Sequence, residues 1–145
     1  MADKYYYLKG KSAWAKIKNP DKEYECYSVD LFLDGESKIL FKDSGLQLKV
    51  KSTEDGDYIR LRRPLQKNFK DKGVVDNGPP QVLLKNADGD YTPFDDFIGN
   101  GSEIICKVRV YDTNRGKGHE LTVVAIEKLV EYKGAEEVGG DDLPF

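Results

Sequence analysis

Alternation of apolar and polar side chains with a period of two is the feature that most restricts the fold of this 145-residue chain. Successive side chains of a β-strand point to opposite faces, so an alternating run predicts a strand with one buried and one exposed face. Such runs occupy residues 5–17, 24–33, 46–51, 58–63 and 104–111. A sixth strand is predicted over 121–132, where β-branched side chains outweigh a partial helical pattern.

Turn residues separate these runs. Asn-Pro-Asp at 19–21 predicts a turn after the first strand, and Asp-Gly at 55–56 predicts a hairpin between the third and the fourth. Residues 64–96 are rich in Lys, Asn, Gly and Pro, so loops with one or two short strands are expected there. Residues 112–119 are expected to form a loop before the last strand.

Helical signals are few. A helix of about two turns is expected over 36–44, ended by Gly45 at its C-cap. Many short strands with Gly and Pro turns predict an all-β barrel or sandwich. The length suits an OB-fold-like small antiparallel barrel with long inserted loops.

The charge divides the chain into two parts. The formal net charge is −3, but all 23 lysines and arginines lie at or before Lys133, and the four acids beyond it leave residues 1–133 at +1. Residues 1–133 are therefore predicted to form one domain. Residues 134–145 contain too few apolar side chains to order themselves and are predicted to be a flexible, disordered acidic tail. Such asymmetry suggests a nucleic-acid or protein partner.

Other segments bear on the compartment. The sequence contains no run of about 18 apolar residues, so no membrane span is predicted. The first residues lack the apolar stretch of a signal peptide. Cys26 and Cys106 match no C-x-x-C spacing and are predicted to be buried thiols. We therefore expect a cytoplasmic protein with no membrane partner.

The sequence offers little for catalysis. His119 is the single histidine, whereas a zinc site needs three or four converging ligands. Cys106 falls on the inward phase of its strand, and the paired acids Asp95 and Asp96 are typical of a solvated turn. The run RGKG at 115–118 lacks the Ser or Thr of a phosphate-binding loop. No catalytic residue, metal or cofactor is predicted.

The outward phase of the strands is more informative, because aromatic and basic residues alternate along it. Aromatic rings stack on the bases of a single strand while cations follow its phosphates. The residues predicted to bind nucleic acid in this way are Trp14, Lys16, Lys49, Lys51, Tyr58, Arg60, Arg62, Lys107, Arg109 and Tyr111. The alternative interpretation is that these cations only protect strand edges and keep the surface polar.

The chain ends in a compact peptide ligand made of acids, a proline-stiffened apolar pair and a terminal aromatic residue. Its residues are Asp141, Asp142, Leu143, Pro144 and Phe145. Carboxylates beside a flat ring imitate single-stranded DNA, so this tail is expected to compete with DNA for the protein's own groove.

These residues resemble known proteins. DDLPF resembles the C-terminal tip of bacterial single-stranded-DNA-binding proteins, where Ile stands in place of Leu143, and the acidic tail with terminal Phe of phage replicative ones. IGNGSEIICKVRVYD (98–112), RGKGHEL (115–121) and LVEY (129–132) are similar to phage OB-fold proteins of that type. The resemblance covers roughly the last third of the chain. It implies an OB-fold, sequence-tolerant binding of single strands and a tail that recruits replication proteins.

The leading hypothesis is a phage-encoded, non-enzymatic single-stranded-DNA-binding protein of replication, recombination and repair. Its partners would be single-stranded DNA and, through the tail, a polymerase, helicase or primase. Assembly into a homo-oligomer is left open. The rival hypotheses are an RNA-binding or cold-shock-like module, a protein–protein adaptor that binds no nucleic acid, and a nuclease using paired acids and Mg²⁺.

Overall fold

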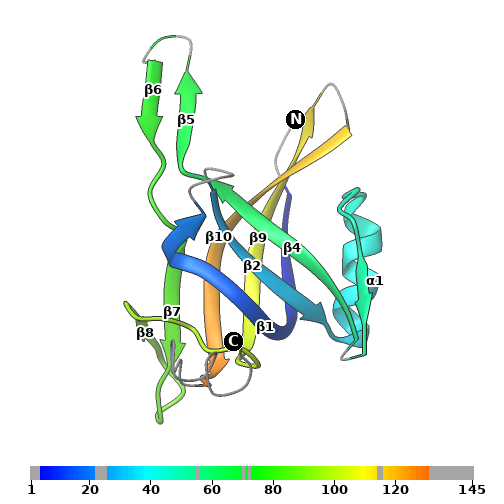
Figure 1. The fold of residues 1–145 in the computed structure, drawn as a ribbon, viewed down its shortest axis with the longest axis vertical. Coiled ribbons are helices and arrows are strands. Elements are labelled where there is room, and N and C mark those ends of the chain that lie inside the picture. The colour runs from blue at the N-terminus through cyan, green and yellow to red at the C-terminus, as the bar shows by residue number, and fades with distance from the viewer. Residues whose placement is uncertain are drawn as a thin grey trace, which may run out of the picture.

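The structure of the protein is a computed structural model. It describes residues 4–21, 26–54, 56–69, 71, 73–113 and 116–130. The chain is mostly β, with one short helix (Figure 1). In chain order the elements are β1 (Lys4–Asp21), β2 (Cys26–Leu33), α1 (Gly35–Ser44), β3 (Lys51–Thr53), β4 (Gly56–Pro64), β5 (Gln66–Phe69), β6 (Gly73–Asp76), β7 (Gln81–Lys85), β8 (Tyr91–Pro93), β9 (Glu103–Thr113) and β10 (Gly116–Lys128).

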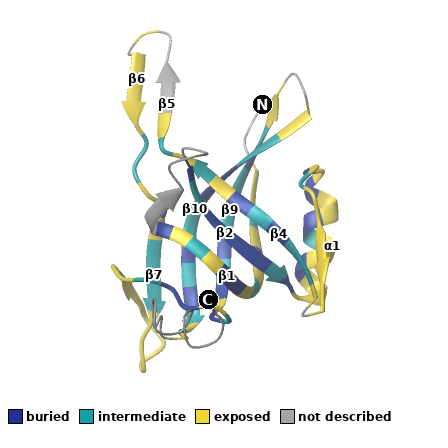
Figure 2. Cartoon of the chain, viewed as in Figure 1, coloured by how far each residue is buried: buried dark blue, intermediate teal, exposed yellow. Residues whose placement is uncertain are grey.

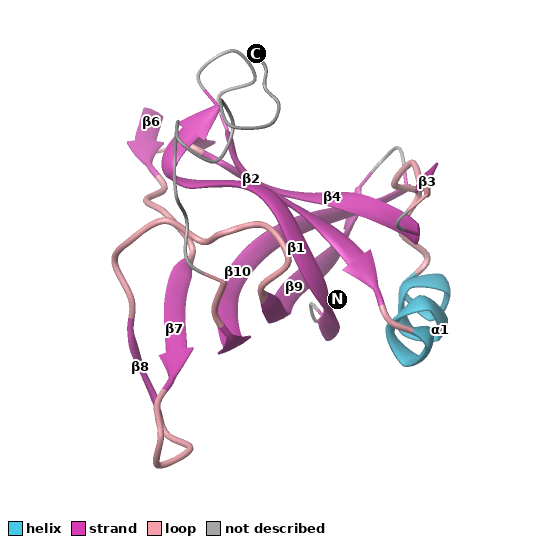
Figure 3. Cartoon of the chain, turned by 60° about the horizontal axis from the view of Figure 1, so that its bottom comes forward, coloured by secondary structure: helices cyan, strands magenta, loops and turns pink. Residues whose placement is uncertain are grey.

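One large sheet contains the strands in the order β3-β4-β2-β1-β9-β10-β7-β8, and β5 and β6 form a separate hairpin. The sheet curls into two layers, with β9 and β10 passing behind β2 and β4 (Figures 1 and 3). Strand β1 joins the layers, because it pairs with β9 over residues 4–11 and with β2 over residues 10–21. All neighbouring pairs are antiparallel except β10 with β7.

The barrel is not closed by a backbone ladder between β4 and β10 in the part of the chain that the structure describes. Polar bridges link the two strands instead. The backbone N–H of Arg62 donates to Nε2 of His119 at 3.0 Å, and the guanidinium of Arg63 donates to the Glu120 carboxylate at 2.9 Å and to the Leu121 carbonyl at 3.3 Å. These contacts hold together the edge where the sheet stays open.

The core lies between the two layers (Figure 2). It contains alternate residues of the front strands, such as Val29 and Leu61, against alternate residues of the back strands, such as Val108 and Leu121, all fully buried. This burial confirms the period-two assignment of inward and outward faces in β4 and β9. In β2 the inward residues Val29, Leu31 and Leu33 are buried as expected, but the outward Cys26, Ser28 and Asp30 are buried too, so the two faces of β2 do not differ in exposure. Burial of an aliphatic side chain of this size contributes roughly 1.5–3 kcal/mol.

Helix α1 forms as the sequence predicts. Asp34 caps its N-terminus by accepting a hydrogen bond from the Ser37 N–H at 2.8 Å, and Gly45 ends it in the left-handed conformation at φ 75°. Phe41 is the buried aromatic residue of the helix and packs into the core. The helix covers one side of the barrel without entering the strand order (Figure 1).

The strands differ from the predictions at several boundaries. The hairpin across residues 55–56 is confirmed, but its first arm spans only Lys51–Thr53, because Leu46 and Leu48 pack onto the core as an irregular segment. The turn predicted at 19–21 is wrong, since β1 continues through Asp21. The predicted strand over 121–132 is confirmed through Lys128.

The two predicted loop regions also contain more strand than expected. Residues 64–96 form four short strands, β5 to β8, rather than one or two. Residues 116–119 belong to β10 and pair with β9, so the predicted loop over 112–119 is largely a hairpin. Strands of three to five residues, such as β5 to β8, are too short to show the alternation that a sequence pattern detects. The tail residues 134–145 lie outside the described residues.

Candidate nucleic-acid interface

Strand register brings an aromatic and basic surface together on the outer side of the front layer. Residues paired across an antiparallel ladder share a face of the sheet, so the paired outward residues form rows. One row is Lys11, Phe32, Tyr58 and Lys51, a second holds Asp30 beside Arg60, and a third is Lys16, Ser28 and Arg62. These residues define the β2–β4 face.

The first row of this face carries two rings in tilted contact and a cation. The rings of Phe32 and Tyr58 lie 5.2 Å apart between centroids at 51°, and Lys51 Nζ lies 6.0 Å from the centroid of Tyr58. The phenol of Tyr58 is half-buried by these neighbours, whereas Lys11 and Lys51 are exposed. The row therefore offers a rigid ring platform with ammonium groups at both ends.

The second row fixes a guanidinium against a buried acid. Asp30 is only 2% exposed, although it lies on the outward phase of β2, and it accepts two hydrogen bonds from Arg60, at 2.7 Å from Nε and 3.2 Å from Nη2. A two-point pair of this kind is strong and directional. Arg60 is thereby held across the face with its orientation set by Asp30.

Trp14 lies on a β-bulge of β1 between the second and third rows of this face. The register passes from Ala13 opposite Asp30 to Lys16 opposite Ser28, so β1 has one residue more than β2 at this point. Trp14 has φ +48°, in the left-handed region that favours glycine, and its ring is 60% exposed. Its backbone N–H donates to Oδ1 of Asn100 at 2.8 Å. A large exposed aromatic residue in a strained bulge is the kind of outlier that points to function.

A second aromatic and basic surface lies on the back layer, formed by Tyr5 and Tyr7 of β1 with Lys107, Arg109 and Tyr111 of β9. We call it the β9 face. Lys107 Nζ lies 4.7 Å from the ring centroid of Tyr5 and 5.9 Å from that of Tyr7, and the guanidinium carbon of Arg109 lies 4.5 Å from that of Tyr111. The two faces have the core between them, so their side chains point away from each other.

Glu120 anchors the arginine of the β9 face. It is 3% exposed, and its carboxylate accepts from Arg109 Nη2 at 2.8 Å and from Arg63 Nη1 at 2.9 Å. One buried acid thus joins β10 to both β9 and β4. Breaking such a pair by removing one partner is strongly destabilising, so Glu120 is first a structural residue.

The structure therefore separates the ten predicted residues rather than placing them along one track. Five lie on the β2–β4 face and three on the β9 face, Trp14 lies on the bulge of β1 beside the first face, and Lys49 is exposed in the irregular segment before β3. The prediction missed four further outward residues, Lys11 and Phe32 on the first face and Tyr5 and Tyr7 on the second. The run of three tyrosines at 5–7 was the one sequence signal available.

The candidate catalytic groups do not assemble into a site. Burial raises the pKa of the Cys106 thiol to about 12, and both Cys106 and Cys26 are buried, as predicted. Burial, aided by the charge of Arg62, lowers the pKa of His119 to about 4, so this imidazole is neutral at pH 7. Among the described residues no group of three His, Cys, Asp or Glu side chains could hold a metal ion.

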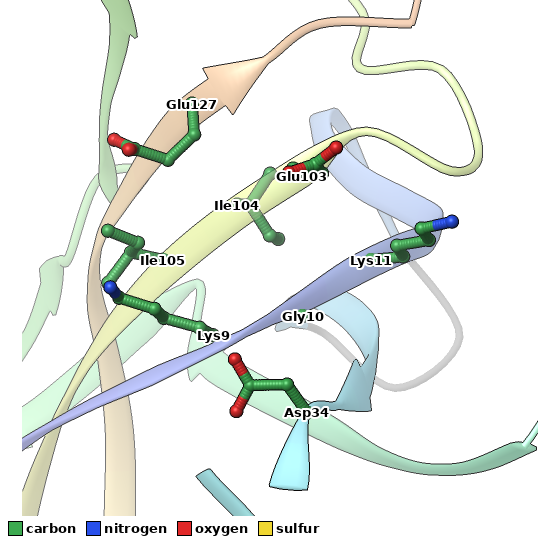
Figure 4. A pocket seen from close by; sticks show the side chains of 8 residues that line it. All are labelled: Lys9, Gly10, Lys11, Asp34, Glu103, Ile104, Ile105 and Glu127. Atoms are coloured by element: carbon green, nitrogen blue, oxygen red, sulfur yellow. The ribbon is translucent and has the colours of Figure 1, made fainter. Parts of the chain in front are cut away.

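A pocket of about 300 Å³ lies where β1, β9 and β10 meet the start of α1 (Figure 4). Its lining mixes two lysines with three carboxylates and two isoleucines: Lys9, Gly10, Lys11, Asp34, Glu103, Ile104, Ile105 and Glu127. These opposed charges favour neither an anion nor a cation. The helix that the structure describes is too short and too polar to cross a membrane.

Comparison with known proteins places this geometry in context. No protein-family model matches the sequence, and no curated protein matches it at a significant level. Solved structures do match. gp2.5, a single-stranded DNA-binding protein encoded by bacteriophage T7, has a TM-score of 0.66 and 17% sequence identity over 99% of this chain and 96% of its own.

A second match is the single-stranded DNA-binding protein from bacteriophage Enc34 in complex with single-stranded DNA, with a TM-score of 0.57 and 14% identity over 90% of this chain and 89% of that one. The chain has the fold of phage single-stranded-DNA-binding proteins. This confirms the resemblance noted in the sequence and the OB-type, mostly β fold class. At these identities the match concerns the fold only. The contacts of individual side chains come from the structure of this chain.

Proposed function

We propose that this chain is a non-enzymatic protein that binds single-stranded DNA with little sequence preference through its β2–β4 face. The observation that carries the proposal is the register of β1, β2 and β4, which collects Phe32 and Tyr58 with five cations on one side of the barrel. Aromatic rings accept any base by stacking, and cations follow the phosphates. OB-folds use the face of their second and third strands for oligonucleotides, here β2 and β4.

The arrangement assigns different tasks to the side chains. Phe32 and Tyr58 form a preset platform, so little side-chain entropy is lost when a base stacks on it. Lys16 and Arg62, exposed in one row, are placed to meet phosphates. Because each phosphate contact releases counterions, affinity should fall with salt at a log–log slope of about −0.7 per contact.

The test is a fluorescence-anisotropy titration of labelled oligothymidylate against the full chain at several salt concentrations. Tyr58→Ala should weaken binding by about 1–3 kcal/mol, and Arg62→Ala should also reduce the salt slope by about 0.7. Tyr91→Ala and Lys38→Ala remove an exposed tyrosine on β8 and an exposed lysine on α1, outside the face, and serve as matched controls.

Equal affinity for duplex and single strands would contradict the proposal, as would variants of the face that bind like the controls. A competition between matched DNA and RNA oligomers separates this function from an RNA-binding module, because only the 2′-hydroxyl differs. An adaptor without nucleic-acid binding would give no anisotropy change with any oligomer.

We further propose that residues 1–133 act as the DNA-binding domain and residues 134–145 as a detachable acidic tail. The tail's carboxylates and Phe145 share the chemistry of a phosphate and a base, so the tail would compete with DNA and, when displaced, recruit a polymerase, helicase or primase. Deletion of 134–145 should strengthen DNA binding, more at low salt because screening weakens the tail's attraction. Unchanged binding would remove the competition while leaving the DNA-binding role.

The biological setting follows as a proposal from this chemistry and from the phage proteins that share the fold. A protein that coats unpaired strands and recruits replication enzymes would act in phage DNA replication, recombination and repair, in the cytoplasm of the host cell. Its partner would be single-stranded DNA, without a membrane or a cofactor.

A further inference from the structure

The β9 face has the composition of a nucleic-acid surface but lies on the other side of the barrel from the β2–β4 face. We propose that it is a second, separate binding surface for an unpaired polynucleotide, so that one chain holds two segments of strand at once. This inference rests on the proposed function and extends it. Four features of the face support it: the exposure of its tyrosines, the spacing of its rows, its charge, and a glycine that leaves room for one ring.

The tyrosines of this face expose a large part of their rings to solvent. Tyr5 is 48% exposed and Tyr7 54%, although both lie within a long paired strand of the main sheet. Lys107 lies over both rings, which sets a positive charge between two aromatic surfaces. An ordinary solvent-facing strand has no need of two half-exposed tyrosines at consecutive outward positions.

The rows of the face have the spacing of a stretched strand. Tyr7 pairs with Lys107, Tyr5 with Arg109, and Tyr111 with Gly118, so the three rings lie in successive rows two residues apart. Two residues of antiparallel strand span about 6.8 Å. Bases of a duplex are stacked about 3.4 Å apart along each strand. Only an unpaired, extended strand can therefore bring successive bases to successive rings.

The charge of the face also favours a polyanion. The cations Lys107 and Arg109 point outward, whereas the acid of the same rows, Glu120, is buried beneath Arg109 and shared with Arg63. Arg109 is thus oriented before any ligand arrives, with its guanidinium against the ring of Tyr111. A protein partner rich in basic residues would be repelled by this arrangement.

Gly118 shows how closely one ring is fitted to the backbone. A Cβ placed on Gly118 would lie 2.6 Å from Cε2 and 2.8 Å from Cζ of Tyr111. The ring therefore lies over β10 at a position where only glycine leaves room for it. Gly118→Ala would displace this ring while removing no charge and no aromatic group, which makes it a specific probe of the surface.

The experiment is a stoichiometric titration of the full chain with labelled hexathymidylate, at protein concentrations well above the dissociation constant. Two oligonucleotides per chain are expected. Tyr5→Leu, Tyr7→Leu and Gly118→Ala should each weaken one of the two sites by about 5- to 150-fold and leave the other intact. Tyr58→Ala should do the reverse. Tyr91→Ala is the control, and urea unfolding verifies that each variant is folded.

Several outcomes would overturn the inference. One is a single oligonucleotide per chain whose affinity falls with Tyr58→Ala but not with Tyr5→Leu, and this result leaves the proposed function standing. Another is a single site weakened by both sets, which would mean one path across both layers. A third is a dimer that Tyr5→Leu dissociates without any change in oligonucleotide stoichiometry. Absence of binding by the wild-type chain would refute the proposed function itself.

Discussion

Replacement of Trp14 separates what this residue does for folding from what it does for binding. Among the described residues it is the non-glycine residue with a positive φ, +48°, and it lies on a bulge within the ladder between β1 and β2. The residue is mostly exposed and lies beside the β2–β4 face. We compare Trp14→Ala with Trp14→Gly, since both remove the ring and only glycine accepts this backbone conformation without strain.

The magnitude follows from two opposing contributions. The left-handed conformation costs a residue with a Cβ about 1–2 kcal/mol. Glycine loses more conformational entropy on folding and is about 0.5–1 kcal/mol worse than alanine at an ordinary strand position. The ring's packing is lost in both variants and cancels in the comparison. Trp14→Gly should therefore be more stable than Trp14→Ala by about 0.5–1 kcal/mol, a reversal of the usual order.

Urea unfolding measures this difference, with Lys9→Ala and Lys9→Gly as the matched pair at an exposed β1 position with ordinary backbone geometry. There alanine should be the more stable residue. Both Trp14 variants should bind oligothymidylate about 1–3 kcal/mol more weakly than the wild type and equally with each other. If Trp14→Ala is as stable as Trp14→Gly, the strained bulge is refuted. If either variant binds DNA like the wild type, the stacking role of Trp14 is refuted.

Two further predictions concern the barrel itself. His119 is half-buried as the neutral imidazole, with its pKa lowered from 6.5 to about 4, so the unfolded state takes up a proton first as the pH falls. The free energy of unfolding should therefore drop by about 2 kcal/mol between pH 7 and pH 5. His119→Gln should lack that component when urea midpoints are compared at the two pH values. Gly10→Ala should destabilise the fold by several kcal/mol, because its Cβ would lie 1.8 Å from the Phe32 carbonyl oxygen; an unchanged urea midpoint would contradict the close packing of β1 on β2.

Much of the fold follows from the sequence because alternation reports burial directly. The inward sets of β2, β4 and β9 and the helix capped by Gly45 are found from local patterns alone. What alternation leaves open is which layer a strand joins. Arg60 and Arg109 are both outward residues, yet they lie on opposite layers of the barrel, and only the strand order reveals this.

The bulge at Trp14 explains why Tyr5 and Tyr7 were missed. Without a bulge, odd-numbered residues of β1 would share one face throughout, and Tyr5 and Tyr7 would lie inward with Ile17. The extra residue reverses the phase, so odd positions point outward before it and inward after it. A period-two pattern contains no such extra residue, so alternation read from Ile17 alone does not show that the two tyrosines lie on the surface.

The near-neutral charge of residues 1–133 also has a partial structural explanation. Each aromatic face carries an arginine whose carboxylate partner is buried beneath it, Asp30 under Arg60 and Glu120 under Arg109. These acids enter the net charge in full, but they lie behind the cations that a ligand would meet. Removing either acid would leave a partly buried arginine without its main partner, at a cost of several kcal/mol. These two acids are a small part of the 22 in residues 1–133, but they show that the distribution of charge over the two faces is a better guide to what they bind than the net charge.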